Sequence, residues 1–153
     1  EVAALIAVIR SQAPSGGAVP EKSFGPVGRL GIALGQFQTA PALVAQFERE
    51  QPISFGDQYE PGRHIAMVNC SMCHGPRLLG KEVRPGSISP DLAIVGAYDL
   101  AAFKRLLRTG VPADGHQLGL MGEVARTGLS HLSDNEIEQL HSYLVSRARA
   151  VSR

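Results

Sequence analysis

Five consecutive residues, Cys70-Ser71-Met72-Cys73-His74, constrain this chain more than any other feature. Two cysteines at this spacing lie about one turn apart on a helix, so both thiols can reach one flat ligand. C-x-x-C-H is the attachment signature of a c-type haem, in which the thiols add to the haem vinyl groups and the histidine ligates the iron. The motif predicts one covalent haem c tethered by Cys70 and Cys73, with His74 as an axial ligand.

Other uses of a C-x-x-C pair account for the motif less completely. The pair alone also fits a redox dithiol, part of a zinc site or a disulfide. A zinc site would need two more Cys or His ligands at metal spacing, and the chain contains only two cysteines. A thioredoxin-like dithiol would follow a strand in a βαβ unit, and no such strand is indicated. Neither alternative explains the adjacent His74.

Length and charge exclude several classes of protein. A chain of 153 residues suggests one domain. A net charge of +1 at neutral pH, with no basic patch carrying interleaved aromatic residues, gives no indication of nucleic-acid binding. No run of 18 or more apolar residues is present, so no segment is predicted to span a bilayer.

Hydrophobic periodicity and capping signals predict an all-α fold. Two long Gly- and Pro-rich loops, 75–98 and 110–132, separate the later helices and are long enough to wrap a flat ligand. The predicted helices are residues 1–12, 41–50, 60–71, a helix capped by Asp99 and ended by Gly110, and a closing helix opened by the capping box Ser133-Asp134-Asn135-Glu136.

The N-terminal part has a different character. Residues 13–57 form a Gly- and Pro-rich linker or extension, with a short apolar piece at 27–37. Residues 1–11 align in helical phase with residues 136–146 of the closing helix. One hypothesis is that residues 1–12 end a preceding haem domain, which would place another C-x-x-C-H upstream. The alternative is that any two amphipathic helices look alike.

The C-terminal part resembles a class I cytochrome c over about residues 58–147, within an expected domain of 58–150. Four parts occur in that family's order: a helix ending in the haem motif, the step Pro90-Asp91-Leu92, a methionine loop, and a closing helix with Tyr143-Leu144. The stretch from Met121 onward is similar to haem domains in multihaem cytochrome subunits of membrane-bound bacterial dehydrogenases. Those subunits carry several haem motifs, whereas this chain has one.

The resemblance implies the second iron ligand and the residues around the first. Met121 lies in the expected loop and would supply a thioether opposite His74. The Pro90 carbonyl would accept a hydrogen bond from His74, and Leu92 would pack on the ring. Met67 and Met72 lie on the cysteine-bearing helix and are expected to be core residues. His116 is the main rival to Met121. Of the other rivals, His64 is expected at the surface, His131 abuts the final capping box, and His141 is expected to be a partly exposed histidine of the closing helix.

These features predict an electron carrier rather than an enzyme, either alone or as a subunit or domain of a larger oxidoreductase. Its partners would be a dehydrogenase, an oxidase or another cytochrome, on the periplasmic or extracytoplasmic face of a membrane. Haem attachment occurs outside the cytoplasm in the cytochromes that the chain resembles, so a chain without a secretory signal would be mature or trimmed. Membrane association through a partner or a further segment is compatible with this. The alternative is a catalytic or gas- or redox-sensing haem with an open or displaceable sixth position.

Overall fold

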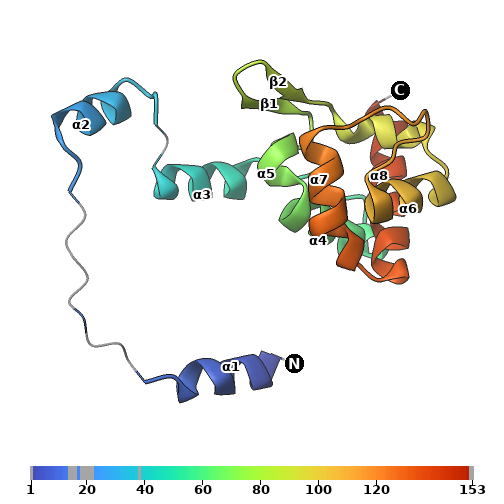
Figure 1. Cartoon of the computed structure of the whole chain (residues 1–153), viewed down its shortest axis with the longest axis horizontal. Coiled ribbons are helices and arrows are strands. Elements are labelled where there is room, and N and C mark those ends of the chain that lie inside the picture. The colour runs from blue at the N-terminus through green and yellow to red at the C-terminus, as the bar shows by residue number, and fades with distance from the viewer. Residues whose placement is uncertain (1, 14–16, 18–22, 38, 152–153) are drawn as a thin grey trace. The chain divides into compact units, whose positions relative to one another are not determined.

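The computed structural model describes residues 2–13, 17, 23–37 and 39–151, and the chain divides into two compact units, Glu1–Thr39 and Ala40–Arg153. The predicted all-α architecture is confirmed over the described residues, where helices dominate and the strands form a single two-stranded hairpin. The second unit carries the haem motif (Figure 1). It begins upstream of the expected domain start at residue 58.

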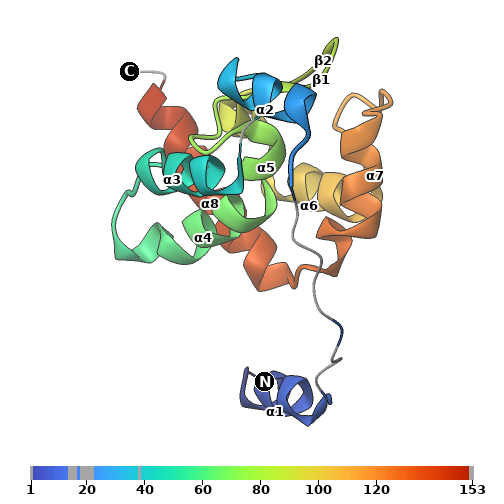
Figure 2. The same cartoon turned by 90° about the vertical axis from the view of Figure 1, so that its left-hand side faces the viewer.

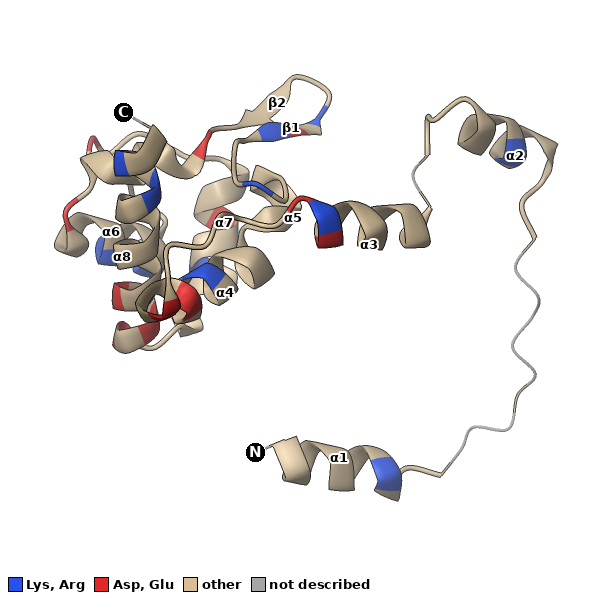
Figure 3. Ribbon diagram, turned by 180° about the vertical axis from the view of Figure 1, so that it is seen from behind, with Lys and Arg blue, Asp and Glu red and all other residues tan. Residues whose placement is uncertain are grey.

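The first unit contains two short helices, α1 (Val2–Ser11) and α2 (Pro26–Ala33). The predicted first helix is confirmed, and α2 forms within the apolar piece at 27–37. Each helix carries one basic residue and no acidic one (Figure 3). Their apolar side chains are mostly exposed within the described structure.

The second unit opens with α3 (Ala40–Arg49), which confirms the helix expected at 41–50. A 3-10 turn, η1 (Asp57–Tyr59), leads into α4 (Glu60–Asn69). The predicted helix over 60–71 does not continue unbroken into the haem motif, because α4 ends at Asn69 with Cys70 as its C-cap. A new short helix, α5 (Ser71–His74), begins after it.

The loop expected at 75–98 is more ordered than the sequence predicts. It contains an antiparallel hairpin of β1 (Lys81–Arg84) and β2 (Ser87–Ser89), followed by the 3-10 helix η2 (Leu92–Ala97). Pro85 and Gly86, with φ +76° at Gly86, form the turn between the strands. Strands of three and four residues are too short to show a clear alternation of side chains.

The helix predicted from Asp99 is α6 (Leu100–Thr109), capped by Asp99 Oδ1, which accepts from the Ala102 N–H at 2.7 Å. The loop predicted after it is partly wrong, since residues 110–132 contain α7 (Leu120–Thr127) and η3 (Leu129–His131). The glycines that flank and interrupt α7 obscured its helical pattern. Met121 therefore lies in the first turn of a helix and not in an irregular loop.

The closing helix α8 (Asp134–Val151) is the longest element and crosses α4 (Figures 1 and 2). Its capping box is confirmed: the Ser133 N–H donates to Glu136 Oε2 at 2.7 Å, and the Glu136 N–H donates to Ser133 Oγ at 3.3 Å. At the crossing, a Cβ on Gly62 would lie 2.8 Å from the Cβ of Tyr143. Only glycine permits this approach of the two backbones.

The hydrophobic core lies between α4, α6, α8 and η2. On the closing helix the side chains of Ile137, Leu140, Tyr143 and Leu144 share one face and are all buried. Their burial supplies much of the stabilisation, because buried apolar area is the main favourable contribution to folding. The buried cluster comprises Ala66, Leu78, Leu92, Val95, Phe103, Leu107, Leu129, Ile137, Leu140, Tyr143 and Leu144.

Candidate haem site

The two cysteines lie where α4 ends and α5 begins. Both are free thiols in the structure. Burial, helped by the neighbouring Cys73, raises the pKa of the Cys70 thiol to about 12, so this thiol is protonated at neutral pH. Within the described residues no group of three or more His, Cys, Asp or Glu side chains could hold a metal ion. These observations argue against the zinc and reactive-dithiol interpretations, which need thiolates.

His74 is buried and already oriented. Its Nδ1 lies 2.8 Å from the carbonyl oxygen of Pro90. A carbonyl only accepts, so Nδ1 carries the proton and the lone pair of Nε2 is available to a metal. Burial lowers the pKa of His74 although the Pro90 carbonyl and the Asp91 charge oppose the shift. The neutral imidazole favoured by this environment is the form that ligates iron.

In the Pro90-Asp91-Leu92 step, Leu92 packs in the core and Asp91 forms an ion pair with Arg147. Leu92 is buried, and its N–H donates to the Leu78 carbonyl at 3.0 Å. Asp91 Oδ1 accepts from Arg147 Nη1 at 2.6 Å. Burial alone would raise the pKa of Asp91, but hydrogen bonds from Arg147 and the Ala93 N–H outweigh it and hold the pKa below its ordinary value.

Sequence reasoning missed Arg147. Its side chain is only 3% exposed, although arginine is rarely buried unless paired. The signal was present in the spacing, because Arg147 lies seven residues after Leu140 and three after Leu144 on the inward face of α8. Helical phase therefore placed a charge in the core, and a buried charge needs a partner.

The three methionines have different environments. Met121 is partly buried and packs against the core cluster. Met67 is half-buried, whereas Met72 is 75% exposed, so the expectation that Met72 is a core residue is wrong. Met72 lies on the short helix α5, which turns its side chain away from the core. With Met67 it lines an apolar groove whose other walls come from α3 and the residues after it: Leu43, Val44, Phe47, Glu48 and Gln51.

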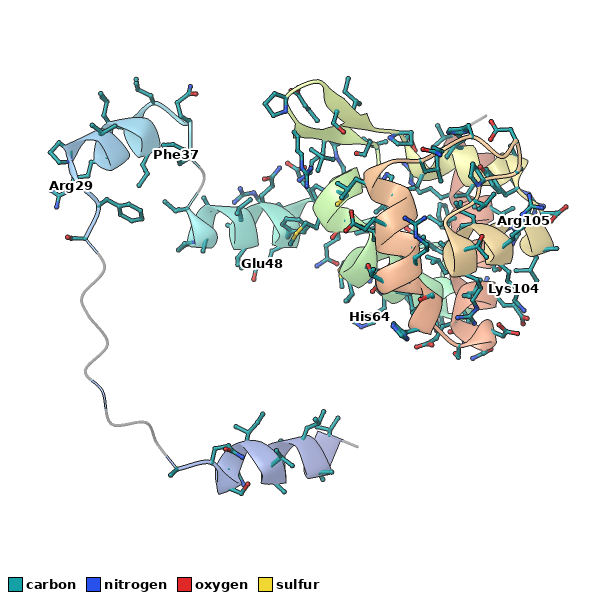
Figure 4. The ribbon with its side chains drawn as sticks, in the orientation of Figure 1. Arg29, Phe37, Glu48, His64, Lys104 and Arg105 are labelled. Atoms are coloured by element: carbon teal, nitrogen blue, oxygen red, sulfur yellow. The ribbon has the colours of Figure 1, made fainter. Side chains whose placement is uncertain are left out.

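The rival histidines are placed away from the core or engaged elsewhere. His116 is exposed, and its Nδ1 lies 2.5 Å from Asp114 Oδ1. His64 and His131 are exposed, and His64 projects outward from α4 (Figure 4). His141 is half-buried, with its Nε2 2.9 Å from the Tyr98 carbonyl and its ring against Phe103. None of these placements favours iron ligation over Met121.

These residues fit a covalent haem. The chain supplies two free thiols at the required spacing, a neutral histidine with Nε2 free, and a thioether packed among apolar side chains. Cys70 and Met121 both pack against the same buried cluster, which gives a porphyrin an apolar wall.

Comparison with known proteins places the chain in a class. Residues 59–148 match the family model described as Cytochrome c, so the chain belongs to the cytochrome c family, with an all-α cytochrome c fold. Members of this family carry a covalent c-type haem, and the Cys70–His74 motif is its attachment sequence. The predicted fold and cofactor are thereby confirmed. The domain transfers electrons by means of its haem.

A more particular likeness comes from a dehydrogenase component. The chain is 26% identical over 140 residues to a subunit of the nicotinate dehydrogenase of Pseudomonas putida. The match covers 78% of this chain and 12% of that relative, so the chain spans a small part of its length. This likeness confirms the expected resemblance to dehydrogenase cytochrome subunits. No solved structure matches the chain. Among the described helices, none has the length and apolar character needed to cross a membrane.

Proposed function

We propose that this domain relays single electrons through a haem c whose axial ligands are His74 and Met121, with Cys70 and Cys73 as its covalent tethers. The observation that carries the proposal is the hydrogen bond between His74 Nδ1 and the Pro90 carbonyl. It leaves Nε2 as the ligating atom before any haem is bound. When bound, the haem supplies a reversible one-electron couple.

The chain's residues would tune that couple in opposite directions. The Nδ1–H donated to Pro90 makes His74 a more basic ligand, which favours the oxidised metal. The thioether of Met121 is a soft ligand, which favours the reduced metal and raises the potential relative to a second imidazole. Leu92 and the apolar cluster would exclude water from the ring. With both axial positions filled, the site would suit electron transfer better than catalysis at the iron.

The partner would be a dehydrogenase to which this domain belongs or docks. Support comes from the related dehydrogenase component, of which the match covers a small fraction. Such a domain would pass electrons to an oxidase or another cytochrome on the extracytoplasmic side of a membrane, where haem c is attached. Residues 1–12 would end a preceding haem domain, and the residues up to Thr39 would connect it to the compact unit that begins at Ala40.

The ligand assignment is tested by the optical spectrum of the oxidised holoprotein. A Met–iron charge-transfer band at about 695 nm is expected in the wild type and should disappear in Met121→Ala. Met67→Ala and His116→Ala are the matched controls and should keep the band, since neither residue is proposed to touch the iron. A high-spin wild-type spectrum without this band that shifts on adding cyanide or carbon monoxide would refute the proposal. Such a spectrum would indicate an open sixth position, as in a catalytic or sensing haem.

A further inference from the structure

Arg147 is a charged side chain in the core, and it has no role in the electron transfer proposed above. It lies on α8 between the buried residues Leu144 and Ala148 and is only 3% exposed. Its Nη1 donates to Asp91 Oδ1 at 2.6 Å. An apolar residue of similar volume would often stabilise such a position as well or better. The pair is therefore better explained by what it holds in place than by the stability it adds.

The group that Arg147 holds adjoins the proximal histidine. The same Oδ1 of Asp91 accepts the Ala93 N–H at 2.7 Å and so caps η2. The residue before Asp91 is Pro90, whose carbonyl oxygen lies 2.8 Å from His74 Nδ1. A fixed Asp91 side chain restrains the rotation of the peptide between Pro90 and Asp91. The direction of the Pro90 carbonyl is thus coupled to Arg147.

The backbone of Gly80 also restrains this peptide. A Cβ on Gly80 would lie 2.8 Å from the carbonyl carbon of Pro90 and 2.9 Å from the Asp91 nitrogen, so the Gly80 backbone packs closely against this peptide. The Gly80 N–H also donates to the His74 carbonyl at 2.8 Å. Gly80 and the Asp91–Arg147 pair therefore both restrain the peptide between Pro90 and Asp91.

We propose that Arg147 is a positioning residue for the proximal iron ligand: through Asp91 it holds the Pro90 carbonyl on His74 Nδ1, and it thereby sets the reduction potential. The inference rests on the proposed function, in which His74 ligates the iron. A well-aligned Nδ1–H···O=C bond increases electron donation from the imidazole and favours the oxidised metal. Loss of the restraint weakens that donation, so the reduction potential rises.

The test must separate positioning from charge. Removing Arg147 alone leaves the Asp91 carboxylate unpaired, and that negative charge would lower the potential while the loosened carbonyl raises it. The double variant Asp91→Asn/Arg147→Met removes one charge of each sign and leaves the net charge unchanged. The asparagine introduced at position 91 can still cap η2 through its side-chain oxygen. The double variant deletes the link to α8, and because it also removes the Asp91 charge that acts on His74, the proton exchange of His74 Nδ1 is the measurement that isolates positioning.

Two measurements on the holoprotein report the link between Arg147 and the Pro90 carbonyl, the first of them made on the reduced form. Solvent exchange of the His74 Nδ1 proton, followed by NMR, should become about tenfold faster or more in the double variant. The reduction potential should rise. Lys104→Met is the matched control, because Lys104 pairs with Glu138 at 3.0 Å and Asp134 at 3.3 Å and so also joins α6 to α8 (Figure 4). It should change neither measurement.

Each outcome decides the inference. Unchanged proton exchange and potential in a folded double variant would overturn it and leave the pair a purely structural one. If the double variant fails to load haem, Arg147→Lys decides instead, since it keeps the charge but loses the planar fork and should give smaller changes in the same directions. No change in Arg147→Lys would then overturn the inference. A wild type without a low-spin, histidine-ligated spectrum would refute the proposed function as well, whereas a normal wild type with unaffected variants refutes this inference alone.

Discussion

The two segments that carry the proposed ligands are held by different forces. On the His74 side, residues distant in sequence are joined by hydrogen bonds, such as those from His74 Nδ1–H to the Pro90 carbonyl and from Ser89 Oγ to the Cys73 carbonyl at 2.5 Å. On the Met121 side, the nearest backbone bond is local, from the Met121 N–H to Leu118, and the side chain is held by apolar packing. The direction of the histidine is therefore determined by polar contacts, whereas the position of the methionine depends on how well the core is filled.

The largest effect on stability should follow from removing a polar contact on the His74 side. Arg147→Ala truncates a buried side chain beside Leu144 and leaves Asp91, whose side chain is 35% exposed, without its partner, and we expect a loss of about 2–5 kcal/mol in the free energy of unfolding. Denaturant unfolding of the holoprotein measures it. A loss below about 1 kcal/mol would show that water replaces the guanidinium at little cost and that the pair restrains the segment weakly.

Two glycines offer a matched test of the two segments. Gly80, with φ +85°, adjoins the Pro90 peptide, and Gly110, with φ +72°, lies where a Cβ would be 2.5 Å from the Gly122 carbonyl oxygen. Because both positions combine positive φ with a close backbone contact, Gly80→Ala and Gly110→Ala should each cost about 1–3 kcal/mol of unfolding free energy.

The spectroscopic consequences of these substitutions should differ. Gly80→Ala should perturb the NMR signal of the His74 Nδ1 proton and leave the Met–iron band, whereas Gly110→Ala should weaken that band, because Gly122 follows Met121 on α7. Identical spectral changes in both variants would show that the two segments respond as one unit. The contrast between them would then be wrong.

A smaller effect on stability is expected at acidic pH. The pKa of Asp91 is lowered in the folded protein, so its contribution to stability is complete well above the ordinary carboxylate pKa of about 3.9. That contribution is lost as the pH falls below this value and through the lower folded pKa. The melting temperature of the wild type should therefore fall more steeply in this acid range than that of Asp91→Asn/Arg147→Met. Parallel curves for the two proteins would contradict the assignment of the shift to this pair.

The elements that were predicted correctly are those whose signals are local. The Ser133–Glu136 capping box, the Asp99 cap and the stop at Gly110 each depend on residues a few positions apart. The missed elements, the β1–β2 hairpin and α7, are short, and each contains one glycine and has another directly before it. Their local preferences are weak, and tertiary contacts decided their conformation.

The same division holds for the site. The Cys70–His74 motif and the cytochrome c class were readable because covalent haem attachment needs a contiguous sequence. The burial of Arg147 was missed although its helical phase indicated it, whereas the exposure of Met72 depends on which face of α5 the rest of the fold covers.

The sequence by itself determined the cofactor, the helical class and the ends of most helices, because these follow from neighbouring residues and from periodicity along one helix. Only the tertiary structure decided that Arg147 meets Asp91, 56 residues away, and that Gly62 lets α4 cross α8 closely enough for Tyr143 to be buried. Such pairings depend on the path of the backbone between distant segments. Their geometry arises when the whole core packs, which no local pattern of residues specifies.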